Sequence, residues 1–258
     1  MLVHAAGFCA TALWPMAQDA VQSLHGGAAL GVDLRGHGLS SAPPGETWSW
    51  DHFALDVLNA LDALSVDRPI GFGHSLGGAA LLLAEAMRPG TFGALYCYEP
   101  VVLLSGDPAP LARSMAEAAR RRRRRFPSRD DARQAFGEKP PMDRFDDGSL
   151  RGYLEGGLIA EAGGVRLACD AEHEARIYEA VPSSTAWEGL GSIRCPVMLA
   201  CGSAPGPTDG RAMATVAERI PTATVEVMEG LGHFGPMERP KEVSASFCHF
   251  VRRNLPSG

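Results

Sequence analysis

The chain has 258 residues, of which 45% are hydrophobic and 21% are charged, and its formal net charge is −6. A globular protein of this composition can bury a large core, which excludes disorder of the whole chain, and its acidic balance argues against a general nucleic-acid-binding protein. No apolar run reaches the roughly 18 residues needed to cross a bilayer, and no basic segment followed by an apolar stretch is visible after Met1. We therefore expect neither a signal peptide nor membrane association.

Short apolar runs alternate with helical stretches along the chain. Because the runs are continuously apolar, they indicate strands that are buried on both faces of a parallel sheet. Their order predicts an α/β fold with a mostly parallel central sheet flanked by helices, including helices over residues 53–64 and 212–220. The predicted strands are residues 1–3, 28–32, 69–73, 94–98, 197–201 and 224–228.

The alternation stops in the middle of the chain, where no convincing strand is found between residues 101 and 190. The spacing of Leu111, Met115 and Ala118 predicts one helix there, and a capping-box pattern at Ser128 predicts the start of another. We therefore expect a helical cap inserted between two strands of the sheet. The core would comprise residues 1–100 and 191–258, and the cap residues 101–190.

A glycine-rich motif, Gly73-His74-Ser75-Leu76-Gly77, lies between a predicted strand and an apolar helical stretch. G-x-S-x-G in this context is the pattern of a nucleophile elbow, a strained turn that projects the serine hydroxyl from the edge of the sheet. The two outer glycines leave room for backbone that passes close to the turn. The helix that begins at Leu76 directs N–H groups toward a developing oxyanion, so Ser75 is the predicted nucleophile rather than an incidental turn serine.

With this motif the chain resembles the α/β-hydrolase family from residue 1 to about residue 252. Residues 4–8 (HAAGF) resemble the family's oxyanion loop, residues 33–40 (DLRGHGLS) its D-x-R-G-H-G-x-S segment, and residues 230–234 (GLGHF) the loop of its catalytic histidine. The resemblance implies the α/β-hydrolase fold. Family members usually have a β-hairpin before the oxyanion loop, so the start at Met1 implies missing N-terminal edge strands or an upstream start codon.

The resemblance also implies the partners of Ser75. His233 would be the general base that takes the serine proton. Where the family most often has its aspartate, this chain has Pro205, and Asp209 lies further along a loop rich in proline and glycine. Glu99 follows the strand at 94–98, the acid position of some members, and a carboxylate ending an apolar strand needs a partner. We therefore predict Glu99 as the catalytic acid, with Asp209 as the alternative.

Backbone N–H groups of Leu76 and Ala6 are implied as the oxyanion hole, although Ala5 stands where the family usually has glycine. His4 and His37 are expected to shape the loops around the site, and His74 is expected to pack away from Ser75. The sequence contains no spacing typical of a metal site, and no cofactor is implied. The six cysteines are scattered, so we expect reduced thiols in a cytoplasmic protein.

Arg120 to Arg125 form a run of six arginines. We expect them mainly on the solvated end of a cap helix, with the alternative that some face the cleft and hold an anionic or phosphate group of the substrate. The bulky apolar residues of the cap either line a substrate pocket or form the core of the cap. They are Phe126, Phe136, Phe145, Tyr153, Leu154, Leu158, Ile159 and Trp187.

These residues together imply a serine hydrolase that cleaves a small carboxylic ester or thioester through an acyl-enzyme. A cofactor-free C–C hydrolase or a haloperoxidase-like activity would use the same residues. A non-catalytic ligand-binding protein on this fold is a third interpretation. Epoxide hydrolases and haloalkane dehalogenases of the family require an aspartate nucleophile, and Ser75 argues against their chemistry.

Overall fold

A single parallel sheet of six strands organises the chain, in the spatial order β2-β1-β3-β4-β8-β9. The computed structural model describes residues 1–42, 48–102, 108–181, 184–206 and 208–255. All six predicted strands are present, although the first two have only two residues each. Their bounds are β1 (Leu2–Val3), β2 (Gly31–Val32), β3 (Ile70–His74), β4 (Ala94–Tyr98), β8 (Val197–Gly202) and β9 (Ala223–Met228).

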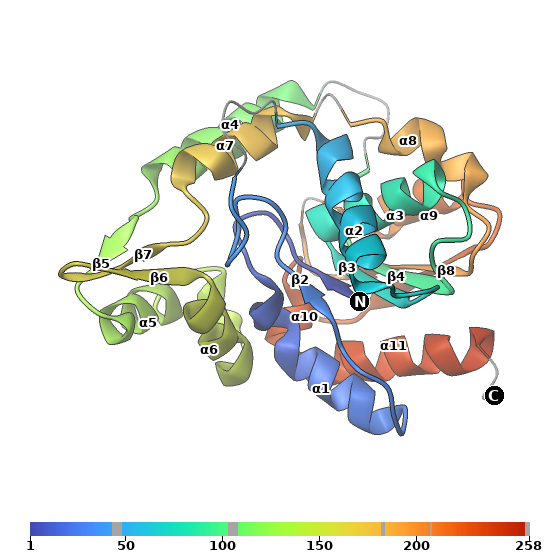
Figure 1. Cartoon of the computed structure of the whole chain (residues 1–258), viewed down its shortest axis with the longest axis horizontal. Coiled ribbons are helices and arrows are strands. Elements are labelled where there is room, and N and C mark those ends of the chain that lie inside the picture. The colour runs from blue at the N-terminus through green and yellow to red at the C-terminus, as the bar shows by residue number, and fades with distance from the viewer. Residues whose placement is uncertain (43–47, 103–107, 182–183, 207, 256–258) are drawn as a thin grey trace.

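Helices cover both faces of this sheet, as the apolar strands require. Figure 1 shows two helices below the sheet, α1 (Trp14–Ser23) and α11 (Pro240–Asn254). The opposite face carries α2 (Trp50–Leu64), α3 (Leu76–Met87), α8 (Ala186–Gly189) and α9 (Gly210–Ala217). Alternate residues of β4 point to opposite faces, so Leu95 joins the core beneath α3 whereas Tyr96 packs with Phe247 of α11.

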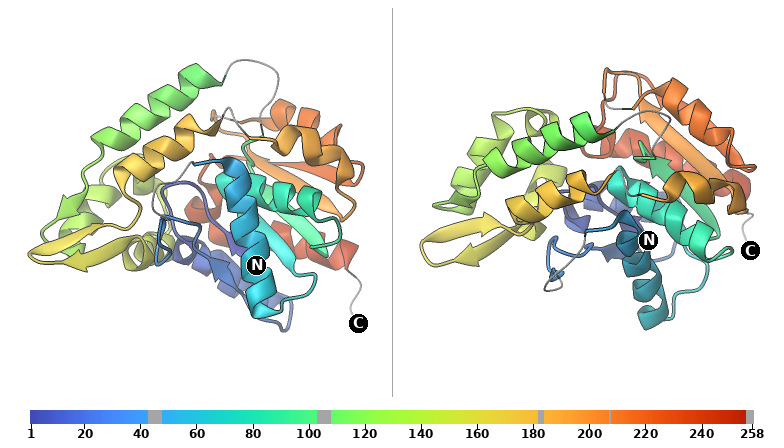
Figure 2. Two further views of the ribbon diagram at one scale, coloured as in Figure 1. Left: turned by 45° about the horizontal axis from the view of Figure 1, so that its top comes forward. Right: turned by 90° about the horizontal axis from the view of Figure 1, so that it is seen from above.

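The chain between β4 and β8, which we call the cap segment, adds helices and a second sheet. Figure 2 shows α4 beside α7, and these two helices pack against each other. Besides α8, its helices are α4 (Ala109–Arg121), α5 (Arg129–Gly137), α6 (Asp147–Gly156) and α7 (Ala171–Glu179), with short 3₁₀ turns at Met142–Arg144 and Leu190–Ser192. The strands are β5 (Arg125–Phe126), β6 (Leu158–Glu161) and β7 (Gly164–Leu167).

The expectation of a strand-free cap is therefore wrong. β5, β7 and β6 form a three-stranded antiparallel sheet, in which β6 and β7 are joined by a tight hairpin. Gly163 in that turn has φ +85°, a conformation that favours glycine. Strands of two and four residues are too short to show a period in sequence, but the Gly163-Gly164 pair is a turn signal.

The arginine run does not continue the cap helix. α4 ends at Arg121, Arg122 has extended backbone angles, and Arg125 is already in β5. Like charges spaced three and four residues apart repel each other on a helix, which disfavours a helical run of this length. Ser128 caps α5 as predicted, since its hydroxyl accepts from the N–H of Asp131 at 3.0 Å.

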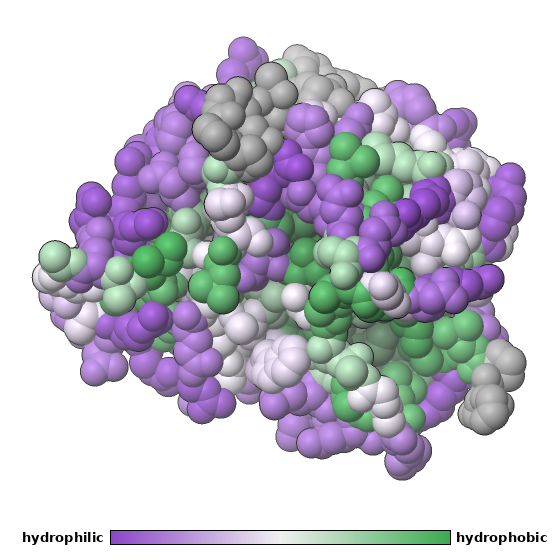
Figure 3. All heavy atoms as spheres, viewed as in Figure 1, coloured by the Kyte–Doolittle hydropathy of each residue, from purple (hydrophilic) through white to green (hydrophobic). Residues whose placement is uncertain are grey.

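On the face drawn in Figure 3, hydrophilic side chains cover α4 and α7, and hydrophobic ones gather near the N-terminus and between the sheet and α11. No helix within the described ranges has the length and apolar character that crossing a bilayer requires.

Candidate active site

Ser75 lies on a sharp turn between β3 and α3, with φ +54° and ψ −114°. A non-glycine residue holds this conformation only where its surroundings enforce it. The neighbouring glycines show how close the backbone is here. A Cβ on Gly73 would lie 2.7 Å from the backbone of Gly77, and one on Gly77 would lie 2.2 Å from the carbonyl oxygen of Val3. The elbow therefore has no room for side chains at either position.

Glu99 and His233 are in direct contact. Glu99 directly follows β4, as Ser75 directly follows the neighbouring β3, and Glu99 also has a positive φ of +43°. Its carboxylate is 1% exposed and accepts a hydrogen bond from Nδ1 of His233 at 2.7 Å. Two further donors satisfy the carboxylate, namely the N–H of Gly202 at 3.1 Å and the Thr208 hydroxyl at 2.5 Å. The bond at Nδ1 leaves Nε2 of His233 on the opposite side of the ring.

The loop that carries His233 is held at two successive carbonyl groups. Nε2–H of His74 donates to the carbonyl of His233 at 2.8 Å, and the Tyr98 hydroxyl donates to that of Gly232, also at 2.8 Å. Burial, with His233 nearby, holds the pKa of His74 well below its ordinary value, so His74 stays neutral. The expectation that His74 only packs thus omitted its bond to the histidine loop.

Two buried histidines hold the loop at residues 4–8. His4 donates from Nδ1 to the carbonyl of Ala5 at 2.7 Å and accepts the N–H of Leu34 at Nε2. His37 accepts the N–H of Gly7 at Nε2, at 2.9 Å, and Gly7 has φ +76°. Burial and the nearby His4 lower the pKa of His37 to about 3, so it can act as this acceptor at neutral pH.

The N–H groups of Ala6 and Leu76 donate to no other described residue. Both residues border the same cavity as Ser75 and His233. Two free backbone donors beside a serine hydroxyl form an arrangement that can hold a developing oxyanion. Among the described residues, no hydrogen bond joins Ser75 to His233, and such contacts often tighten only when substrate binds.

This cavity has a volume of about 900 Å³ and lies between the sheet and the cap segment. Its walls are mainly apolar. The α4 face predicted from sequence contributes Leu111, Met115 and Ala118 to them. Of the bulky cap residues, Phe126 and Phe136 line the cavity. The other bulky residues do not line it. Phe145, Tyr153, Leu154, Leu158 and Trp187 pack in the hydrophobic core, and Ile159 is half-buried in β6.

Asp209, the alternative acid predicted from sequence, caps a helix instead of bonding to His233. It is the N-cap of α9, where its side chain accepts the N–H of Ala212 at 2.9 Å. Its neighbour Thr208, rather than Asp209, reaches the Glu99 carboxylate. The structure thus brings Glu99, and not Asp209, to His233.

Sequence reasoning missed an ion pair between the half-buried Arg122 and the buried Glu174, beside the loop at residues 4–8. Arg122 pairs with Glu174, donates to the Tyr153 hydroxyl at 3.0 Å and lies against Gly7. The Tyr178 hydroxyl donates to Glu174 at 3.2 Å. The arginine run was the one available signal, but the identity of its acidic partners depends on how α7 packs against α4.

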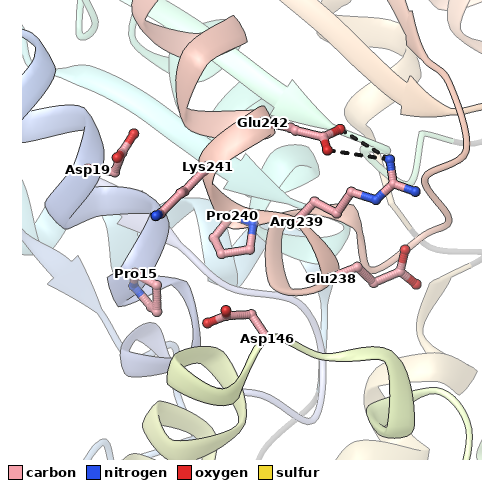
Figure 4. Close-up of a pocket in the computed structure, with 8 residues that line it drawn as sticks. All are labelled: Pro15, Asp19, Asp146, Glu238, Arg239, Pro240, Lys241 and Glu242. Carbon is pink, nitrogen blue, oxygen red and sulfur yellow. Dashed lines mark hydrogen bonds and ion pairs between the residues drawn. The ribbon is translucent and has the colours of Figure 1, made fainter.

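A second, smaller hollow of about 340 Å³ lies where α1, α6 and α11 meet, apart from Ser75 and His233. Figure 4 shows Lys241 and Asp19 in it, with Arg239 paired to Glu242. It contains none of the site residues predicted from sequence. No cluster of three or more His, Cys, Asp or Glu side chains suited to a metal ion occurs in the described part of the chain.

Comparison with known families agrees with this architecture. A model of the alpha/beta hydrolase family matches residues 1–246. The chain belongs to the alpha/beta hydrolase family. Among solved alpha/beta hydrolase structures it is similar to E-2-(acetamidomethylene)succinate hydrolase, with a TM-score of 0.82 and 18% identity over 97% of this chain and 90% of that one. A thermophilic esterase from Thermogutta terrifontis gives a TM-score of 0.72 and 19% identity over 98% and 89% of the two chains.

Curated alpha/beta hydrolase relatives match over shorter segments. Monoglyceride lipase of Homo sapiens is 32% identical over 98 residues, 34% of this chain and 32% of that protein. An epoxide hydrolase of Caballeronia sordidicola is 31% identical over 108 residues, 42% of this chain and 32% of that protein. Esterase YbfF of Escherichia coli (strain K12) is 38% identical over 56 residues, 22% and 21% of the two chains. The matches thus span a third or less of these relatives.

Proposed function

We propose that this chain is a serine hydrolase that cleaves a carboxylic ester or thioester through an acyl-enzyme. Ser75 is the nucleophile, His233 the general base and Glu99 the acid that orients it. The N–H groups of Ala6 and Leu76 bind the oxyanion. Residues 101–190 form a cap over the substrate cavity, and the core comprises residues 1–100 and 191–258.

One observation carries this proposal: a carboxylate that is 1% exposed bonds to Nδ1 of His233 at 2.7 Å, in a cavity bordered by Ser75. A buried carboxylate in this position favours the His233 tautomer that has a lone pair on Nε2, and it stabilises the imidazolium formed during turnover. The strained elbow and the two free N–H groups supply the other requirements of acyl transfer.

The reaction proceeds in two halves. Ser75 Oγ bonds to the acyl carbon as His233 Nε2 takes its proton, and the carbonyl oxygen becomes an oxyanion held by Ala6 and Leu76. The tetrahedral species then expels the alcohol or thiol, which receives the proton from His233. Water attacks the acyl-enzyme with the same proton transfers, releasing a carboxylic acid and restoring the Ser75 hydroxyl.

Hydrolysis of p-nitrophenyl acetate and butyrate tests this function, with Ser75→Ala and His233→Ala as variants. We expect turnover by the wild type and a loss of about 10⁴-fold or more in kcat for each variant, since members of a triad act as a unit. Circular dichroism establishes that each variant is folded. A folded wild type that neither hydrolyses these esters nor reacts with a fluorophosphonate would support the ligand-binding interpretation instead.

A further inference from the structure

The charged side chains that line the large cavity are mostly basic. Arg122, Arg123 and Lys139 border it, and Glu174 is the sole acid among the described lining residues. This basic lining is local, because the whole chain has a net charge of −6. The cavity therefore has an electrostatic character opposite to that of the molecule.

Arg122 and Glu174 neutralise each other. They form an ion pair, and Tyr153 and Tyr178 bond to its two ends. A charge that is already paired and hydrogen-bonded offers little further attraction to a ligand. Arg123 and Lys139 are then the cations that remain available to a substrate.

Arg123 also differs from its neighbours in the arginine run. Arg120 pairs with Glu172 and Glu179, Arg121 with Glu117, and Arg125 with Glu161. Among the described residues, neither Arg123, Arg124 nor Lys139 forms an ion pair with an acidic side chain. Arg123 borders the cavity and Arg124 does not.

Aromatic contacts hold Arg123 in place. Its guanidinium lies 4.6 Å from the centre of the Phe126 ring, and its Nε–H donates to the carbonyl of Arg125 at 3.0 Å. Phe126 packs against Phe136, which lies three residues before Lys139, with ring centres 5.1 Å apart. Both cations line the same cavity as these two aromatic rings, and both cationic side chains are exposed.

We propose that the natural substrate has an anionic group, a carboxylate or a phosphate, at the end remote from its scissile carbonyl, and that Arg123 and Lys139 bind this group. The chain between them would lie along Phe126, Phe136 and the apolar face of α4. This inference rests on the proposed function, because it concerns the far end of the same ester or thioester substrate that Ser75 would attack. It accounts for two cations without an acidic partner in a mainly apolar cavity of an acidic protein.

Monoesters of dicarboxylic acids with p-nitrophenol, in a series of increasing chain length, test the proposal against neutral p-nitrophenyl alkanoates of the same length. A second series ends in phosphate instead of carboxylate, which distinguishes the two anions. We expect one chain length at which kcat/KM for the anionic ester exceeds that of its neutral counterpart. Equal or lower values for both anionic series at every length would overturn the proposal.

Matched variants locate the effect. Arg123→Gln and Lys139→Gln should each reduce the anionic-to-neutral ratio of kcat/KM by about threefold, and the double variant by about tenfold, as expected for exposed charge contacts. Raising the salt concentration should reduce the ratio in the wild type. Arg124→Gln and Lys241→Gln remove cations outside the cavity, and a similar reduction in these controls would refute the assignment to Arg123 and Lys139.

Binding can be measured without turnover. Calorimetric titration of the wild type and the double variant with the monoamides of the same diacids measures recognition of the anion alone. Weaker binding by the double variant supports the anion site even if no ester is cleaved, whereas equal binding contradicts it. Failure of the proposed function and failure of this inference are therefore distinguishable.

Discussion

His74 and Tyr98 are paired in register on the neighbouring strands β3 and β4, and they donate hydrogen bonds to two consecutive carbonyls of the loop that carries His233. Each of these residues precedes a residue assigned to the proposed triad, since Ser75 follows His74 and Glu99 follows Tyr98. The ends of β3 and β4 that present Ser75 and Glu99 therefore also hold the loop that carries His233. Burial raises the pKa of Tyr98, which keeps its hydroxyl protonated as a donor.

Tyr98→Phe should reduce kcat for p-nitrophenyl butyrate by about tenfold and change KM little, because one hydrogen bond of the His233 loop, worth about 1 kcal/mol or more, is lost. Tyr96→Phe is a matched control on the same strand, since the Tyr96 hydroxyl bonds to Ser246 at 2.8 Å, away from that loop. Steady-state kinetics of both variants decide the question. Equal kcat values for the two would show that the Tyr98 bond is merely structural.

Three buried histidines should make the protein less stable in acid. Burial lowers the pKa of His4, His37 and His74, that of His37 from 6.5 to about 3. The unfolded chain therefore binds protons below about pH 6.5 that the folded chain does not. The free energy of unfolding is at its full value above this pH and falls by about 1.4 kcal/mol per pH unit for each such histidine below it.

Urea unfolding at several pH values between 5 and 8 measures how the free energy of unfolding depends on pH. The informative comparison is between the wild type and His37→Gln. Its slope with pH should be shallower than that of the wild type by about 1.4 kcal/mol per pH unit below the ordinary histidine pKa. His249 is exposed, so His249→Gln should keep the wild-type slope. Identical slopes for the wild type and His37→Gln would contradict the account of a neutral His37.

The six cysteines should be unreactive in the folded protein. All six are free and buried, and burial raises the pKa of each thiol, to about 11 for Cys9 and Cys201 and about 12 for Cys195. Because the thiolate is the reactive form, Ellman's reagent should titrate no thiol before unfolding and all six in denaturant. Rapid reaction of a native thiol accompanied by loss of activity would indicate a cysteine in the site.

The sequence predicted most of the fold because its signals are local. Continuous apolar runs indicated the six strands of the sheet, and the G-x-S-x-G spacing indicated the turn at Ser75. The small sheet formed by β5, β7 and β6 was missed because its strands are too short for periodicity to distinguish them from loops. The resemblance to the α/β-hydrolase family was also recognisable from sequence, because four motifs, at residues 4–8, 33–40, 73–77 and 230–234, follow one another in the order typical of the family.

The contacts around the candidate site were harder to predict because they join distant segments. Thr208 and Gly202 reach Glu99 only once β8 lies beside β4. The bond from His74 to the carbonyl of His233 spans 159 residues and depends on a neutral, buried imidazole. The residues next to Glu99 and His74 in the sequence do not show which distant groups these side chains will contact.

The central claim is that Glu99 orients His233 for attack by Ser75, and the rate of fluorophosphonate labelling tests it most directly. Peptide mass mapping of the wild type should find a single adduct on Ser75. Glu99→Gln should slow labelling by about 10³- to 10⁴-fold, because an amide at this position favours the wrong tautomer of His233. Asp209→Asn, which keeps a residue able to cap α9, should label at the wild-type rate. Wild-type labelling by Glu99→Gln, or slow labelling by a folded Asp209→Asn, would contradict the account.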